Sequence, residues 1–159
     1  MRTATGREVV VSMLELATDI AHWNKKYTTK KVLLNKLDEM GLTSHQIEVL
    51  GFMYANPELD TVSQLSSELL VSKGSLSLMI SKLENGGFVQ KKAPKGEDDG
   101  RKVYISLTKK GRKAVEEVRE TMVISASDVF DDMDEERRTL FYTKVKELQE
   151  LFNTGGWRE

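Results

Sequence analysis

The side chains with the clearest chemical potential lie in the stretch 98–111, DDGRKVYISLTKKG. Asp99 and Arg101 are separated by one glycine, and the residues after them alternate between polar and apolar, as in a β-strand. A carboxylate can hold a guanidinium by a charge-assisted hydrogen bond, and an arginine presented in this way suits insertion into a DNA groove. Thr108 is placed to accept a backbone N–H bond at the start of the next helix. With a preceding strand at 88–93, the stretch predicts the "wing" of a winged helix.

A short helix with a small outer face precedes this hairpin. Ser72 is a favourable N-cap, and Gly86 and Gly87 are suited to end a helix, so we expect the helix to span 73–85. A rotation of about 100° per residue directs four apolar side chains toward the core: Leu76, Met79, Ile80 and Leu83. The opposite face presents Gly74, Ser77, Leu78 and Ser81, flanked by Lys73, Ser75 and Lys82. Such a face can enter the major groove of DNA, while the lysines reach phosphates.

Leu78 is the unusual member of this outer face. An exposed leucine often has no function, because much of any protein surface is apolar. A leucine in the major groove can also contact the methyl group of a thymine. The sequence leaves both interpretations open.

The rest of the chain predicts further helices and no repeat. Apolar residues recur three and four apart over 6–27, which indicates an amphipathic helix, whereas the sequence does not decide whether residues 28–41 continue it. Thr43 with Gln46 and Thr61 with Gln64 match capping boxes that begin helices at 44–55 and 62–69. The second of these and the helix 73–85 form a helix-turn-helix pattern. The remaining expected elements are strands at 88–93 and 102–107 around a loop at 94–101, a helix at 109–128, and a last helix that begins near Asp132–Glu135.

Basic residues are concentrated in the part of the chain that carries the helix 73–85 and the hairpin. The 159-residue chain has a net charge of −1. Residues 73–113 contain 11 basic and 4 acidic side chains, a net charge of +7, whereas residues 1–72 and 114–159 have net charges of −2 and −6. A local excess of this size is typical of a surface that binds phosphates. A solvated lysine-rich surface would give the same count.

Several classes of protein are disfavoured. The chain has no cysteine, which removes disulfides and thiolate metal sites. His22 and His45 are its only histidines, and no catalytic or metal-binding motif accompanies them, so we expect no enzyme activity, metal or cofactor. No apolar run approaches the roughly 20 residues that span a bilayer, and the N-terminus lacks the apolar segment of a secretory signal. We therefore expect a cytoplasmic protein that does not associate with membranes.

The order of these elements and the residues of the hairpin resemble the MarR family of bacterial transcriptional regulators, from about Val9 to Phe152. The family's Asp-x-Arg, alternating strand and Leu-Thr-x-x-Gly are matched by Asp99, Arg101, Val103, Ile105, Leu107, Thr108 and Gly111. The resemblance implies a mainly α fold with a small β-hairpin, in which terminal dimerisation helices flank a winged helix-turn-helix. It assigns residues 1–42 to N-terminal dimerisation helices, 43–111 to the DNA-binding lobe and 112–159 to C-terminal dimerisation helices.

The same resemblance implies a function. The protein would be a homodimer that binds a pseudo-palindromic operator in double-stranded DNA, with the helix 73–85 in the major groove and the hairpin in a flanking minor groove. It would be a repressor released by a small-molecule effector. His22, Trp23 and Tyr27 are candidate effector contacts, although aromatic residues at helical spacing are more often packing residues. The alternative is a winged-helix module that binds protein and not DNA.

Ten residues are candidate DNA contacts, five on the helix and five on the hairpin. They are Lys73, Ser75, Ser77, Leu78 and Lys82 on the helix, and Lys91, Lys95, Asp99, Arg101 and Lys102 on the hairpin. Arg101 would enter the minor groove, and Asp99 would orient its guanidinium without touching DNA. Many family members carry an arginine or another long polar group where this chain has Leu78, and Gly74 replaces a more usual serine or alanine. We therefore expect few base contacts from the helix and a larger share of DNA-shape readout.

Overall fold

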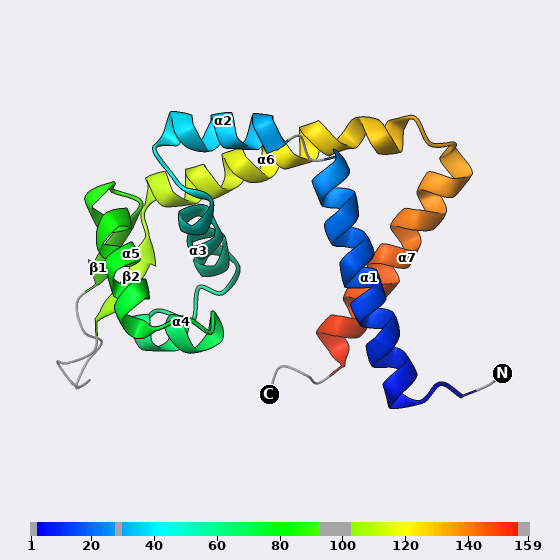
Figure 1. Cartoon of the computed structure of the whole chain (residues 1–159), viewed down its shortest axis with the longest axis horizontal. Coiled ribbons are helices and arrows are strands. Elements are labelled where there is room, and N and C mark those ends of the chain that lie inside the picture. The colour runs from blue at the N-terminus through cyan, green and yellow to red at the C-terminus, as the bar shows by residue number, and fades with distance from the viewer. Residues whose placement is uncertain (1–2, 28–29, 93–102, 156–159) are drawn as a thin grey trace. The chain divides into compact units, whose positions relative to one another are not determined.

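The computed structural model describes residues 3–27, 30–92 and 103–155. In these ranges the elements are α1 (Gly6–Tyr27), α2 (Lys30–Met40), α3 (Ser44–Ala55), α4 (Val62–Glu68), α5 (Lys73–Asn85), β1 (Val89–Lys92), β2 (Tyr104–Leu107), α6 (Lys109–Asp131) and α7 (Glu135–Thr154) (Figure 1). This order confirms the expected mainly α fold with one antiparallel hairpin. The chain forms two compact units. We call them the hairpin lobe (Lys30–Met122) and the terminal-helix unit (Met1–Thr29 with Val123–Glu159).

Two helix starts in the hairpin lobe are fixed by the predicted capping boxes. At the start of α3, Thr43 Oγ1 accepts a hydrogen bond from Gln46 N–H at 3.3 Å, and Gln46 Oε1 accepts one from Thr43 N–H at 2.8 Å. Thr61 and Gln64 form the same reciprocal pair at the start of α4. Each box satisfies N–H groups that the first turn of a helix leaves without partners.

Some boundaries differ from the sequence-based expectation. The helix α4 ends one residue earlier than expected, at Glu68, and α6 continues three residues further, to Asp131. The two strands are shorter, at 89–92 and 104–107. Val103, expected to be an apolar strand residue, is exposed and precedes β2. The helices α1 and α2 are separate elements, and residues 28–29 between them lie outside the described ranges.

The hairpin is joined to the segment before α4. In the β1–β2 ladder, Val89 is opposite Leu107. On the other side of β2, Ile105 N–H donates to the Asp60 carbonyl at 2.8 Å, and Thr61 forms an isolated bridge with Tyr104. The base of the hairpin is therefore fixed to the helix-turn-helix by backbone hydrogen bonds as well as by packing.

The core of the hairpin lobe is built from apolar side chains, most of them leucine, valine and isoleucine. The most completely buried are Leu37, Leu50, Leu65, Leu76, Leu83 and Ile105. The expected core face of α5 is confirmed for Leu76, Ile80 and Leu83, whereas Met79 is half-buried at the edge of the core. The helix α2 and the first half of α6 belong to this lobe, although the sequence grouped them with the terminal helices.

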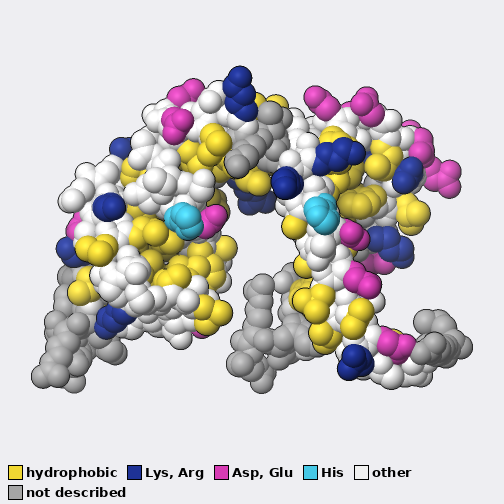
Figure 2. Space-filling view, in the orientation of Figure 1, with side chains coloured by type: hydrophobic (Ala, Val, Ile, Leu, Met, Phe, Trp, Pro, Cys, Tyr) yellow, Lys and Arg dark blue, Asp and Glu magenta, His cyan; other side chains and the backbone are white. Residues whose placement is uncertain are grey.

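The terminal-helix unit exposes much of its apolar surface. Within the described residues, α1 and α7 bury no side chain, and Figure 2 shows hydrophobic side chains exposed along α1. On its two long helices the large exposed apolar residues are Val9, Val10, Val11, Met13, Leu14, Leu16 and Ile20 of α1, and Leu140, Phe141, Tyr142, Val145, Leu148, Leu151 and Phe152 of α7. None of the described helices has both the length and the apolar character needed to cross a membrane.

Candidate nucleic-acid interface

The helix α5 begins immediately after a tight turn that follows α4. Ser72 is its N-cap, and the Ser72 hydroxyl accepts a hydrogen bond from Ser75 N–H at 3.1 Å. In the turn, Leu70 has φ of 53°, the left-handed region that disfavours side chains with a Cβ, and its side chain is 92% exposed. At the other end of α5, Gly87 takes the left-handed conformation with φ of 75°, whereas Gly86 has φ of −76°. Only the second of the two predicted terminating glycines therefore needs to be glycine for its backbone conformation.

All five residues of α5 that the sequence proposed for DNA contact are exposed: Lys73, Ser75, Ser77, Leu78 and Lys82. The faces of α5 are therefore divided as expected, with the apolar stripe inside and the small polar stripe outside. A Cβ added to Gly74 on the outer face would meet no atom within 4 Å. Because this glycine carries no side chain, the first turn of α5 can approach a ligand more closely there than at its neighbours.

One of the five hairpin candidates lies within the described residues. Lys91, on β1, forms an ion pair with Glu84 of α5, with 2.8 Å between Nζ and Oε2. Its ammonium is thus directed toward the last turn of α5. The other four candidates, Lys95, Asp99, Arg101 and Lys102, lie outside the described residues.

Hydrogen bonds join residues at the start of α6 to the backbone at the end of α5. The sequence did not indicate these contacts. Thr108 caps α6 as predicted, accepting a hydrogen bond from Gly111 N–H at 3.0 Å. Its hydroxyl also donates to the Gly87 carbonyl at 2.6 Å. Lys110 Nζ donates to the Gly86 carbonyl at 2.7 Å and lies 4.3 Å from the centre of the Phe88 ring. Lys110 therefore places its positive charge at the C-terminus of α5, where the helix dipole favours a cation.

Gly111 packs directly against the backbone of Phe88. A Cβ added to Gly111 would lie 2.1 Å from the Phe88 carbonyl oxygen. Thr108 N–H donates to the same oxygen at 3.0 Å. The glycine of the Leu-Thr-x-x-Gly motif thus allows α6 to pack directly against the backbone that follows α5. A glycine in the first turn of a helix was the only sequence signal for this contact.

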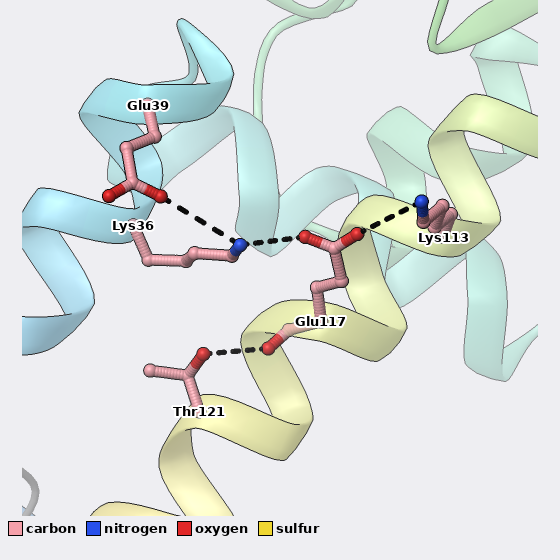
Figure 3. A network of polar contacts seen from close by, with 5 residues as sticks. All are labelled: Lys36, Glu39, Lys113, Glu117 and Thr121. Atoms are coloured by element: carbon pink, nitrogen blue, oxygen red, sulfur yellow. Dashed lines mark hydrogen bonds and ion pairs between the residues drawn. The ribbon is translucent and has the colours of Figure 1, made fainter.

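A network of ion pairs joins α2 to α6 in the same lobe (Figure 3). Glu117 accepts from Lys36 at 2.8 Å and lies 3.5 Å from Lys113, while Glu39 lies 3.8 Å from Lys36. The side chains of Lys36 and Glu117 are 29% and 35% exposed. The hydrogen bond from Lys36 is the main cause that lowers the pKa of Glu117, and the same bond raises the pKa of Lys36. These ion pairs fix α2 to α6, and none of them involves a side chain of α5.

The three candidate effector contacts lie in the terminal-helix unit, where two of them join an aromatic cluster. The ring of Trp23 is 5.6 Å from that of Tyr27 and 5.3 Å from that of Phe130, and Phe130 is 5.3 Å from Phe141. Such tilted pairs are typical of packed aromatic side chains. His22 is exposed. In the described ranges, no group of three histidine or acidic side chains is arranged to hold a metal ion.

Comparison with known proteins identifies the family. A sequence profile of the MarR family matches residues 40–102. The HTH-type transcriptional regulator TcaR of Staphylococcus aureus is 31% identical over 130 residues, which are 82% of each chain. The chain belongs to the MarR family. As a MarR protein it is a winged helix-turn-helix transcriptional regulator and not an enzyme.

Solved structures share the MarR fold at lower sequence identity. The transcriptional regulator Tm0710 from Thermotoga maritima is 21% identical with a TM-score of 0.72, and the alignment covers 93% of this chain and 99% of that one. The MepR–DNA complex from S. aureus is 20% identical with a TM-score of 0.63, covering 87% of this chain and 98% of that one. At these identities the similarity supports the architecture and not the role of individual residues.

Proposed function

We propose that this MarR protein is a homodimer that binds a pseudo-palindromic operator in double-stranded DNA. The observation that carries the proposal is the outer face of α5, where small residues and one leucine, Leu78, lie between two exposed lysines, Lys73 and Lys82. This helix belongs to the segment 73–113, whose net charge is +7. A helix of this kind suits the major groove, and its lysines suit the phosphates on either side. The S. aureus relative MepR, whose structure was solved with DNA, supports the same use of the fold.

Dimerisation through the terminal helices is the second part of the proposal. The apolar side chains of α1 and α7 are exposed in a single chain. Exposed apolar surface of this extent is unusual for a monomer and typical of an interface. A two-fold dimer would present two copies of α5, which requires operator half-sites about one turn of DNA, roughly 34–36 Å, apart.

Repression with release by an effector is the third part. An effector would weaken DNA binding only by favouring an arrangement of the two hairpin lobes that does not fit the half-site spacing, a coupling of about 1–3 kcal/mol. The packing of Trp23 and Tyr27 in the aromatic cluster supports a structural role for them, and an effector that contacts them would have to open that cluster. As a DNA-binding regulator, the protein would act in the cytoplasm.

Selection from random duplexes tests the proposal and identifies the operator in the same experiment. The purified protein is mixed with a pool of random DNA, bound duplexes are recovered over several rounds, and the enriched sequences are read. We expect an inverted repeat with half-sites one helical turn apart. Enrichment of no motif would contradict operator binding and favour the protein-binding winged-helix module.

Arg101→Ala tests the proposed role of the hairpin tip. Loss of a guanidinium from the minor groove should weaken binding to the selected operator sharply, whereas Arg119→Ala, at an exposed position of α6, should not. Asp99→Ala should have a smaller effect than Arg101→Ala, because Asp99 only orients the guanidinium. Equal binding by wild type and Arg101→Ala would refute the role of the wing.

A further inference from the structure

Leu78 is the one large apolar side chain on the outer face of α5, and it is 69% exposed. Gly74 lies about one helical turn before Leu78. Ser77 is the residue immediately before Leu78, and Ser81 lies nearly one turn after it. Residues three and four apart share a face of a helix. The centre of the outer face therefore consists of one leucine surrounded by a glycine and two serines.

Two serine hydroxyls on the outer side of α5 and its cap are directed at the helix itself. Ser81 Oγ donates to the Ser77 carbonyl at 3.0 Å, which uses the donor of that hydroxyl. Ser72 Oγ donates to Ser75 Oγ at 2.8 Å within the N-terminal cap. The side chains that make paired hydrogen bonds to guanine or adenine are arginine, lysine, asparagine and glutamine. Before its last residue, Asn85, α5 contains none of these except Lys73 and Lys82, which flank the centre of the face. Polar readout of bases by the centre of this face is therefore weak.

We propose that Leu78 reads the C5 methyl group of a thymine in each operator half-site. The inference rests on the DNA binding proposed above and specifies the base chemistry that α5 recognises. Among the groups that the major groove presents, the thymine methyl is the apolar one, so it is the feature that a leucine can distinguish. The open space at Gly74 lets the first turn of α5 approach the bases. The exposed Lys73 and Lys82 favour a phosphate-bearing partner for this apolar surface over an apolar protein.

The methyl group can be removed without any change in base pairing. Replacing thymine by deoxyuridine deletes only the C5 methyl. Burial of one methyl group corresponds to about a fourfold change in affinity. A dimer that loses the contact in both half-sites should therefore bind about 15-fold more weakly.

The experiment is a scan of the selected operator with deoxyuridine at each thymine in turn, made symmetrically in both half-sites, with the affinity measured at fixed salt. We expect one thymine position at which wild type loses about 15-fold. At that position Leu78→Ala should bind the thymine and deoxyuridine operators equally, because the leucine that senses the methyl is gone. Leu70→Ala is the matched control: it truncates another exposed leucine of the same lobe, outside α5, and should keep the full sensitivity.

Two results would overturn the inference while leaving operator binding intact. One is equal wild-type affinity for every deoxyuridine operator. The other is a methyl effect that persists undiminished in Leu78→Ala, which would assign the methyl contact to another residue. Failure of wild type to bind any selected duplex would overturn the proposed function and this inference together.

Discussion

Gly111→Ala should destabilise the protein, although alanine in place of glycine normally favours a helix. Gly111 lies in the first turn of α6, and a Cβ there would lie 2.1 Å from the Phe88 carbonyl oxygen. Real Cβ atoms essentially never approach closer than 3.0 Å, so α6 and the backbone at Phe88 must separate by about 1 Å. The obstacle is backbone, which cannot rotate away as a side chain can.

The size of the effect follows from the groups at this contact. The Thr108 N–H donates to the Phe88 carbonyl at 3.0 Å, and the Thr108 hydroxyl donates to the neighbouring Gly87 carbonyl at 2.6 Å. Separation weakens both, at a net cost of about 1 kcal/mol each, and overpacking adds about 1–3 kcal/mol. Alanine is more favourable than glycine in a helix, which offsets about 1 kcal/mol of this loss. The free energy of unfolding should therefore fall by about 2–4 kcal/mol.

Urea unfolding followed by circular dichroism measures this loss as a lower midpoint with an unchanged slope. Variants must be compared at equal protein concentration, because dimerisation contributes to stability. Gly51→Ala is the matched control: it lies inside α3, where a Cβ would meet no atom within 4 Å. It should raise the free energy of unfolding by up to about 1 kcal/mol. A Gly111→Ala protein as stable as wild type would refute the close approach of α6 to Phe88.

Three other substitutions test separate parts of the hairpin lobe. Thr61→Ala removes the cap of α4 and should lower the free energy of unfolding by about 1 kcal/mol, seen as a lower urea midpoint. Leu70→Gly should raise the free energy of unfolding by about 0.5–1 kcal/mol, because relief of the left-handed backbone strain exceeds the added chain entropy of glycine. A lower urea midpoint would show that Leu70 is unstrained. The lowered pKa of Glu117 contributes stability at neutral pH that is lost as the pH falls through the folded-state pKa, which lies below the usual glutamate range. The raised pKa of Lys36 contributes stability that is lost as the pH rises through the folded-state pKa, which lies above the usual lysine range. Glu117→Gln should remove both pH dependences, and an unchanged pH profile would show that the pair does not stabilise the fold.

The helices were predictable because their signals are local. Capping boxes at Thr43 and Thr61, and an N-cap at Ser72, define helix starts from residues three positions apart. The spacing of Leu76, Ile80 and Leu83 likewise indicates the buried face of α5, whatever elements pack against it.

Contacts between residues distant in sequence were not predictable in the same way. Charge counting treated Lys91 and Lys110 as equivalent to the other basic residues of the segment 73–113. In the structure Lys91 pairs with Glu84, and Lys110 binds the Gly86 carbonyl 24 positions away. Part of the excess positive charge therefore holds the lobe together, and the sequence alone does not indicate which lysines do so. The tip of the hairpin, with Arg101, lies outside the described residues, so its role stays a prediction from sequence.

The salt dependence of operator affinity tests DNA binding by the hairpin lobe most directly. If each protomer of a dimer neutralises about three phosphates, a plot of log affinity against log salt concentration should have a slope of about −5. Lys73→Gln should make that slope less steep by about 2, because each protomer of the dimer loses one phosphate contact. Lys113→Gln, at a lysine that lies 3.5 Å from Glu117, should not change the slope. An affinity for the operator that is independent of salt would contradict the proposed mode of binding.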